Sequence, residues 1–188
     1  MIADCPKKCA AGNGCVFFSL TGKFVGVHDK LFENDCRVFH ESGGKIHMKI
    51  AVYCASEFGK EELYTEAARE LGQWIGASKH TLVYGGGESG LMGIVAKEVH
   101  DAGCEVIGVV PGNVAFIKNR PQPYVTKLIF TEDMSERKRK MLELADVFIA
   151  LPGGIGTLDE ISETITLTKI GVFHKPSILF NRNGFYEP

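Results

Sequence analysis

The sequence has no run of 18 or more apolar residues, so we expect no membrane-spanning helix. It also has no strong excess of one charge, because 21 basic and 23 acidic side chains leave a formal net charge of −2. A general electrostatic attraction to nucleic acid is therefore not expected. No apolar segment follows basic residues at the N-terminus, as a secretory signal would require. We accordingly expect a cytoplasmic protein whose thiols stay reduced.

The rest of the composition is that of an ordinary globular chain. Hydrophobic residues make up 45% of the 188 positions and charged residues 23%, which is enough apolar material for a core. The length fits one domain, and a second full domain would be cramped. Glycine is abundant at 22 residues, so the places where the glycines gather are informative.

Residues 1–47 show little helical or strand periodicity, although they contain four of the six cysteines. We predict a poorly ordered extension, in which residues 16–20 and 24–27 could pair as a short hairpin. A zinc site is an alternative, but the spacing of its candidate ligands matches no common zinc pattern. Those ligands would come from Cys5, Cys9, Cys15, His28, Cys36 and His40. A further alternative is that the natural chain begins at Met48, directly before a strand-like segment.

From residue 48 onward, short apolar runs alternate with segments of helical periodicity. This alternation indicates βαβ units and a parallel sheet, and the continuously apolar runs indicate strands covered on both faces. We predict an α/β fold with a doubly wound parallel sheet, in which ligands bind beyond the carboxyl ends of the strands. The expected strands are 49–54, 81–84, 105–110, 126–130, 146–151 and 176–180, and the expected helices are 61–77, 91–102, 134–145 and 157–170.

A first glycine loop, Gly85-Gly-Gly-Glu-Ser-Gly-Leu-Met-Gly93, lies between a strand and a helix. It contains the pattern GxGxxG, in which glycines let the backbone approach a phosphate at a helix N-terminus. The next strand ends in Val109-Val-Pro-Gly112 without the acid that holds a dinucleotide ribose, and no Walker lysine follows the loop. Phosphate binding and a tight structural turn both remain open for this loop.

A second glycine loop, Pro152-Gly-Gly-Ile-Gly-Thr-Leu-Asp-Glu160, also leads from a strand into a helix. Its glycines and the Thr157 hydroxyl could donate hydrogen bonds to a phosphate. Thr157 and Glu160 have the spacing of a capping box, in which the carboxylate binds the backbone of the first residue. The spacing alone therefore favours a helix cap over a catalytic role for Glu160.

The helix expected at 134–145 carries Arg137 and Lys138 beside its apolar stripe, close to its N-terminus. Cations there oppose the helix dipole, which suggests that an anion binds nearby. The alternative is that both long side chains simply extend to solvent from a half-buried face. The basic run 137–140 has no interleaved aromatic residues, so it does not indicate nucleic-acid binding.

Taken together, these motifs resemble the Lonely Guy (LOG) family of cytokinin riboside 5′-monophosphate phosphoribohydrolases. The resemblance rests on Tyr84-Gly-Gly-Gly-x-x-Gly-Leu-Met-Gly93, Glu136-Arg-Lys138, Pro152-Gly-Gly-x-Gly-Thr-x-x-Glu160, Val52-Tyr-Cys-Ala-Ser56 and Lys175-Pro176. It covers residues 48–188 and implies a Rossmann-like nucleotide-binding domain, usually a homodimer. The implied reaction is hydrolysis of the N-glycosidic bond of an N6-modified AMP to the free base and ribose 5-phosphate.

The resemblance also implies roles for individual residues. The catalytic pair would be Arg137 and Glu160. The substrate-binding residues would be Lys138, Gly153, Gly154, Gly156, Thr157 and Thr166, to which we add Gly86 and Gly87 of the first loop. No metal or cofactor is expected. Many family members carry an older lysine decarboxylase label, but the residues show no Schiff-base lysine with a pyridinium partner.

The chain departs from the family pattern at several points. Ala55-Ser-Glu57 stands where Gly-Ser-Ser is usual, Ile155 replaces a common tyrosine, and Leu167 replaces a tryptophan. Residues 113–129 contain no glutamate, and the chain ends at Pro188 where the family continues, so we expect a C-terminally truncated domain. These departures concern the base more than the chemistry. Two alternatives therefore stay open, which are a nucleotide carrier or sensor with little turnover and a general AMP nucleosidase.

Overall fold

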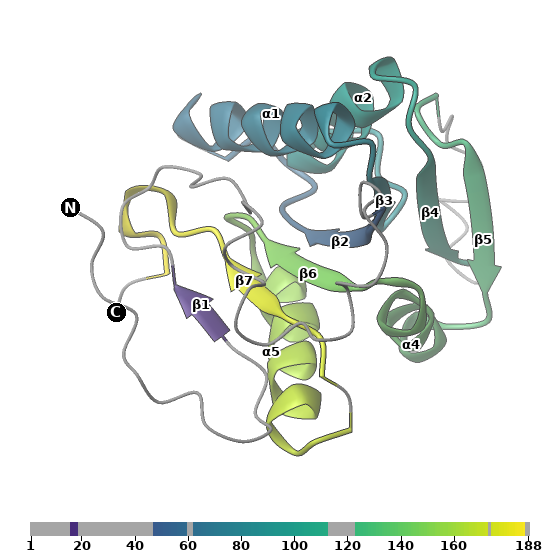
Figure 1. Cartoon of the computed structure of the whole chain (residues 1–188), viewed down its shortest axis with the longest axis vertical. Helices are drawn as coiled ribbons and strands as arrows, with labels where there is room; N and C mark the ends of the chain where they lie inside the picture. The colour runs from purple at the N-terminus through teal and green to yellow at the C-terminus, as the bar shows by residue number, and fades with distance from the viewer. Residues whose placement is uncertain (1–15, 19–46, 60–61, 113–122, 173, 187–188) are drawn as a thin grey trace.

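The computed structural model describes residues 16–18, 47–59, 62–112, 123–172 and 174–186. They form one seven-stranded parallel sheet with helices on both faces (Figure 1). The elements are β1 (Val16–Phe18), β2 (Lys49–Tyr53), α1 (Glu62–Ala77), β3 (Thr81–Tyr84), α2 (Gly90–Asp101), β4 (Val106–Pro111), β5 (Lys127–Thr131), α4 (Met134–Leu144), β6 (Val147–Ala150), α5 (Ile155–Lys169), β7 (Ser177–Leu179) and the 3₁₀ turn η2 (Arg182–Gly184).

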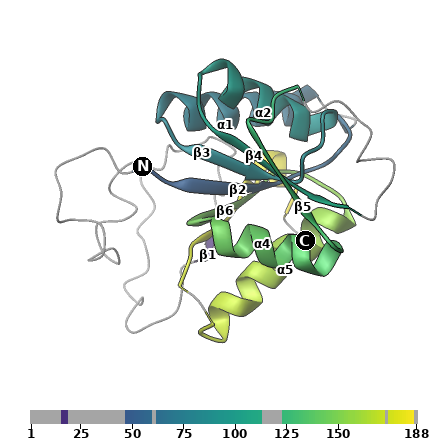
Figure 2. The same cartoon turned by 90° about the vertical axis from the view of Figure 1, so that its right-hand side faces the viewer.

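The strand order is β1-β7-β6-β2-β3-β4-β5, and every neighbouring pair is parallel. The chain runs outward from β2 to β5, then crosses back to β6 on the other side of β2. Helices α1 and α2 cover one face, and α4 and α5 cover the other (Figure 2). The predicted doubly wound fold is confirmed. The direction in which successive strands are added to the sheet reverses between β2 and β6. Doubly wound sheets open a ligand crevice at such a point, at the carboxyl ends of the strands.

Alternation along the strands divides the interior into two cores. In β2, Ile50 and Val52 join the core beneath α1 and α2, whereas Ala51 and Tyr53 join the core beneath α4 and α5. All four side chains are at most 2% exposed. Strands that are apolar on both faces are what a sheet covered by two helical layers requires. This burial fixes the strand register and so the positions of the strand ends.

The six strands and four helices predicted after residue 48 are confirmed, with ends that agree to within two residues. The largest difference is at α5, which begins at Ile155 rather than Thr157. In the N-terminal segment, β1 covers part of the strand expected at 16–20 and pairs with β7 at the sheet edge. Its expected hairpin partner at 24–27 lies outside the described residues, as do all six candidate zinc ligands. The division between residues 47 and 48 stays a prediction.

None of the helices within the described ranges is both long and apolar enough to cross a membrane.

Candidate active site

An ion pair between α4 and α5 lies at the carboxyl end of the sheet. Arg137 of α4 donates from Nη1 to Oε1 of Glu160 on α5 at 2.7 Å, and the two side chains are only 8% and 7% exposed. Arg137 also donates from Nε to the carbonyl of Val109 in β4 at 3.1 Å. The two residues that the resemblance implied as catalytic are therefore in direct contact, in a place that excludes most water.

Two side-chain caps fix the start of α4, the helix that carries Arg137 in its first turns. Asp133 is the N-cap and accepts a hydrogen bond from the backbone of Glu136 at 2.8 Å. The Glu136 carboxylate in turn accepts from the backbone of Glu132 at 2.6 Å. Two backbone donors at the helix start are satisfied in this way. The sequence analysis missed this cap, although Asp133-x-x-Glu136 is the spacing that indicates one.

The capping box predicted for α5 is wrong. Helix α5 begins two residues before Thr157, with Gly154 as an N-cap that offers no side chain. Thr157 is therefore a helical residue, and the Glu160 carboxylate binds Arg137 instead of the backbone at the helix start. Extended backbone at Gly154, with φ −89° and ψ −158°, starts the helix without a side-chain cap. Thr157 and Glu160 have the spacing of a capping box, but Thr157 is not the residue at which the helix begins.

Burial governs the electrostatics around Glu160. Loss of water raises the pKa of the Glu160 carboxyl above its usual 4.5, although the Arg137 charge and hydrogen bond act in the opposite direction. Tyr53 and Cys54 at the end of β2 also have raised pKa values, first because they are buried and then because of the Glu160 charge. The carboxylate therefore acts in dry surroundings, where its field on a nearby cation is strong.

The second glycine loop is open above this pair. Gly154 and Gly156 are exposed, and a Cβ at either position would have no atom within 4 Å. Ile155 between them is 85% exposed. The first N–H groups of α5 have no acceptor within their own helix, so they can receive an anion. Gly153 instead lies against Thr157, whose Cβ would be 2.7 Å from a Cβ at that glycine.

The first glycine loop is filled by the protein itself. A Cβ at Gly87 would lie 2.9 Å from the Met92 sulfur, and one at Gly90 would lie well inside 3.0 Å of the Ser56 backbone. Gly90 and the buried Gly86 also adopt φ of +62° and +75°, which strains any other residue. The N-terminus of α2 already binds a protein oxygen, because Met92 donates to the Ala55 carbonyl at 3.4 Å. These contacts favour the structural turn over phosphate binding here.

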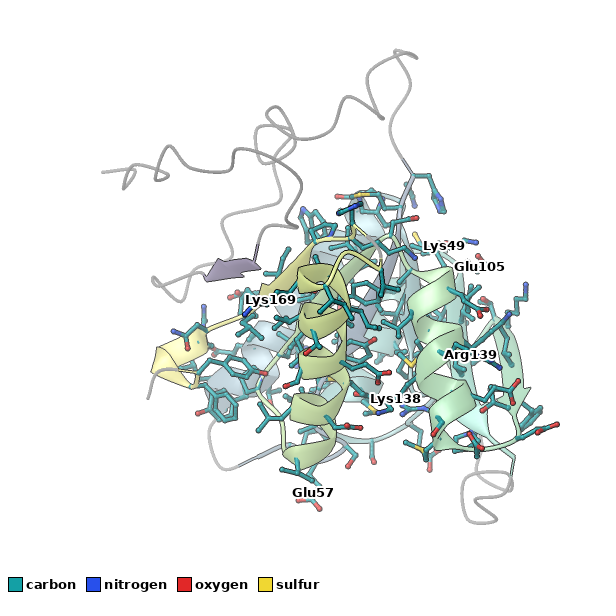
Figure 3. The ribbon with its side chains drawn as sticks, turned by 90° about the horizontal axis from the view of Figure 1, so that it is seen from below. Lys49, Glu57, Glu105, Lys138, Arg139 and Lys169 are labelled. Atoms are coloured by element: carbon teal, nitrogen blue, oxygen red, sulfur yellow. The ribbon has the colours of Figure 1, made fainter. Side chains whose placement is uncertain are left out.

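Lys138 links the same two helices on the outside of the site. Its ammonium contacts Asp159 at 3.0 Å and Glu163 at 2.9 Å, and hydrogen bonds to Glu163 and Asp159 raise its pKa. Figure 3 shows Lys138 between α4 and α5, at the end of α5 that lies toward Glu57. The lysine that was expected to contact a ligand is thus already paired with two carboxylates of α5.

Thr166 is not brought to the Glu160 carboxylate within this chain. It is exposed on α5, six residues after Glu160, which corresponds to a rise of about 9 Å along the helix. The described residues also contain no group of three or more His, Cys, Asp or Glu side chains that could hold a metal ion.

Comparison with known proteins agrees with the motifs. The sequence model of the family described as "Possible lysine decarboxylase" matches residues 92–188. The cytokinin riboside 5′-monophosphate phosphoribohydrolase LOG of Oryza sativa subsp. japonica is 46% identical over 140 residues, which cover 74% of this chain and 57% of the rice protein. The enzyme of that activity name from Rhodococcoides fascians is 40% identical over 139 residues, covering 74% of this chain and 70% of the relative.

Solved structures of similar fold carry a different name. The Moco carrier protein from Chlamydomonas reinhardtii is 27% identical with a TM-score of 0.59, covering 71% of this chain and 76% of that one. The molybdenum cofactor binding protein from Rippkaea orientalis is 26% identical with a TM-score of 0.59, covering 72% and 77%. The chain spans about three-fifths of the plant relatives it matches. By its family match and its identity to the bacterial relative, the chain belongs to the LOG family of cytokinin riboside 5′-monophosphate phosphoribohydrolases.

Proposed function

We propose that this protein hydrolyses the N-glycosidic bond of a purine nucleoside 5′-monophosphate to give the free base and ribose 5-phosphate. The observation that supports this most is the buried ion pair of Arg137 and Glu160 directly below the open glycine loop of α5. Cleavage at an anomeric carbon needs a carboxylate held in dry surroundings, and a nucleotide needs a phosphate site. The helix supplies both within its first two turns.

The substrate phosphate would bind the N-terminus of α5, at the N–H groups of Ile155, Gly156 and Thr157. Glu160 follows Thr157 by three residues, which is a rise of about 4.5 Å along the helix. A ribose ring spans such a separation, so its anomeric carbon would come to lie near the Glu160 carboxylate. The open space at Gly154 and Gly156 leaves room for this approach.

The reaction would break the bond between the anomeric carbon and the base nitrogen and form a bond to a water oxygen. Positive charge develops on the ribose as the base departs, and the Glu160 carboxylate would stabilise it and accept a proton from the attacking water. That proton then replaces the lost bond on the base nitrogen. Arg137 would hold Glu160 in place and keep it ionised, because its charge lowers the carboxyl pKa against the effect of burial.

For the base, we propose a cytokinin, that is, an N6-modified adenine. The rice and Rhodococcoides relatives carry that substrate in their names. The exposed Ile155 and Phe58 add apolar surface near the carboxyl ends of the strands, which suits an apolar N6 substituent. A general AMP nucleosidase would use the same carboxylate and differ only in its base pocket.

A nucleotide carrier with little turnover is a second candidate function. It is favoured by the similar solved structures, which are a Moco carrier protein and a molybdenum cofactor binding protein. A carrier can use the same open helix N-terminus but has no need for a buried carboxylate beside the bound sugar. The role of Glu160 therefore separates the two candidates.

We also propose a cytoplasmic homodimer. Cys54 and Cys104 are free thiols, which fits a reducing compartment. Exposed apolar side chains lie toward both ends of α5, and Thr166 is exposed between them. They are Leu158, Ile170 and Val172. A second copy packed there would bury this surface and bring its own Thr166 toward the first copy. Light scattering on the chain and on Val172→Glu tests this proposal, since the variant should shift toward monomer.

The test of function is incubation with isopentenyladenosine monophosphate and with AMP, followed by chromatography of the released base. Base release from the modified nucleotide that is lost in Glu160→Gln would support the proposed activity. Release from AMP at an equal or higher rate would favour the general nucleosidase. Binding of both nucleotides without any release would contradict the hydrolase and favour the carrier.

A further inference from the structure

The guanidinium of Arg137 is confined on three sides. Nε donates to the Val109 carbonyl at 3.1 Å, and Nη1 donates to Glu160 at 2.7 Å. The third nitrogen, Nη2, lies over Gly85, where β3 has just ended. A Cβ on Gly85 would be 3.3 Å from Cζ of Arg137 and well inside 3.0 Å of Nη2. The arginine therefore occupies the space where any other residue would carry its side chain.

Backbone conformation does not explain the glycine at position 85. Its neighbours Gly86 and Gly90 adopt positive φ, but Gly85 is absent from the described residues that do so. Its φ is outside the left-handed region that favours glycine, and the two atoms nearest to an added Cβ both belong to the side chain of Arg137. The reason for glycine here is thus steric and specific to the arginine.

We propose that Gly85 is a positioning residue for catalysis, whose missing side chain forms the slot that holds Arg137 against Glu160. The catalytic part of this statement rests on the proposed function, whereas the slot itself does not. The first glycine loop would then serve the reaction through the arginine and not by touching the nucleotide. This is a different role from phosphate binding, which the glycine pattern of the loop first suggested.

The consequence of filling the slot follows from the shape of the guanidinium. Its three nitrogens are fixed in one plane, so Nη2 cannot move away from Gly85 while Nε and Nη1 stay in place. Relief of the clash must tilt or withdraw the whole group. The bond between Arg137 and Glu160 is then lengthened or lost, and Glu160 loses the cation that favours its charged form.

A double-mutant cycle of Gly85→Ala and Arg137→Lys tests this proposal. Lysine keeps the charge but lacks a nitrogen in the position of Nη2. In the Arg137 background we expect Gly85→Ala to lower kcat about 100-fold, the cost of a misplacement near 1 Å, with KM nearly unchanged. In the Arg137→Lys background the same substitution should lower kcat less than about threefold. Equal losses in both backgrounds would overturn the slot, because they would indicate general damage to the loop.

Gly103→Ala is the matched control for a glycine substitution elsewhere. Gly103 has φ +71°, and a Cβ at that position would have no atom within 4 Å, so alanine strains the backbone without touching the site. It should lower Tm and leave kcat unchanged. Gly85→Ala should instead lower kcat strongly while the protein keeps a folded near-ultraviolet circular dichroism spectrum.

Titration of the Glu160 carboxyl by carbon NMR tests the slot without any turnover. In Gly85→Ala the pKa of Glu160 should be higher than in the unaltered protein, because the arginine has moved away. An unchanged pKa would contradict the proposal. If the unaltered protein hydrolyses no nucleotide, the proposed function fails, but a raised pKa in Gly85→Ala would still establish the slot. Failure of the slot and failure of the proposed function can therefore be distinguished.

Discussion

The two glycine loops of this protein share a sequence pattern and a place after a parallel strand, but their surroundings are opposite. At the loop before α2, added side chains would meet the Arg137 guanidinium, the Met92 side chain or the Ser56 backbone. At the loop before α5, Gly154 and Gly156 face open space. One loop lets the protein pack closely against itself, and the other leaves room for something that is not protein.

This difference explains why a glycine pattern alone is a weak sign of phosphate binding. Glycine indicates that something approaches the backbone closely, and both loops satisfy that condition. What approaches is decided by the rest of the fold. At α2 the helix N-terminus receives the Ala55 carbonyl, whereas at α5 the N-cap is a glycine with no side-chain bond. The predictions below test this contrast, from the largest expected effect to the smallest.

The largest effect is expected at the carboxylate beneath the open loop. Glu160→Gln should lower kcat about 1000-fold, because the amide neither accepts a proton nor stabilises the ribose cation as an anion does. Nucleotide affinity should change little, since the phosphate binds three residues earlier. Steady-state kinetics and calorimetric titration measure the two quantities. The control is Glu143→Gln, an exposed carboxylate of α4 that pairs with Lys140; an equal loss there would contradict a special role for Glu160.

Arg137 and Lys138 both link α4 to α5, but their removal should affect stability very differently. Arg137→Met leaves Glu160 buried without its cation, which should cost about 3 kcal/mol in the free energy of unfolding at neutral pH. Lys138→Met removes the more exposed ion pairs to Asp159 and Glu163 and should cost less than about 1 kcal/mol. Urea unfolding of both variants measures the two losses of stability. Similar losses would show that burial of the Arg137–Glu160 pair has little effect on stability.

The pH dependence of Arg137→Met gives a second check on the same pair. Burial raises the pKa of Glu160 in the folded state, and without the arginine only the smaller effect of the Lys138 charge still lowers it. The folded variant would then keep a proton that the unfolded chain loses near its ordinary carboxyl pKa. Its stability should therefore rise as the pH is lowered toward that value. A deficit that stays constant with pH would argue against a buried, unpaired carboxylate.

Alanine substitutions in the two glycine loops should change stability in opposite directions. Gly90→Ala places a Cβ against the Ser56 backbone at a φ of +62°, so it should cost about 3 kcal/mol of stability. Gly156→Ala lies in the first turn of α5 with no atom within 4 Å, so it should gain about 0.5 kcal/mol while weakening nucleotide binding. Thermal unfolding and nucleotide titration test both. A stable Gly90→Ala or an unstable Gly156→Ala would break the contrast between the loops.

Most of the fold could be predicted from the sequence, because short apolar runs and a period of 3.6 residues are local signals. The apolar run of β2 and the helical stripe of α4 depend on neighbours in the chain, so the predicted boundaries of both elements are nearly right. Helix α5 was misplaced by two residues because a glycine N-cap leaves no polar side chain to recognise. The Thr157 spacing then suggested a capping box that the fold does not form.

The site could be predicted only in outline. The rule that ligands bind beyond the carboxyl ends of parallel strands drew attention to the segments that carry Arg137 and Glu160, and the family resemblance implied their catalytic roles. Their contact, the carbonyl of Val109 and the space at Gly85 depend on segments far apart in the sequence. Lys138 shows the same limit, because nothing local indicated that Asp159 and Glu163 would bind it. Such pairings depend on the three-dimensional fold and leave no local signal in the sequence.

The smallest effect is expected at the opposite end of the sheet. There the protonation of His80 should change stability without affecting either glycine loop. Burial, and then the nearby His47, lower the pKa of His80, whose Nδ1 accepts from the Met48 backbone at 3.2 Å. Lys49 and Glu105 mark this end in Figure 3, far from Glu57. The folded state keeps His80 neutral, whereas the unfolded chain takes up a proton near its ordinary pKa of 6.5.

The stability that His80 contributes is therefore complete above about pH 6.5 and is lost as the pH falls through the lower pKa of the folded state. Glu160 acts in the opposite direction, because its raised pKa favours the folded state as the pH falls. The quantity to measure is thus the difference in Tm between the protein and His80→Gln from pH 7.5 to 5.5. Glutamine can still accept from Met48 but does not titrate, so the advantage of the unaltered protein should shrink toward pH 5.5. A difference that is constant with pH would remove His80 as the cause, and a parallel change in kcat would contradict its separation from the two loops.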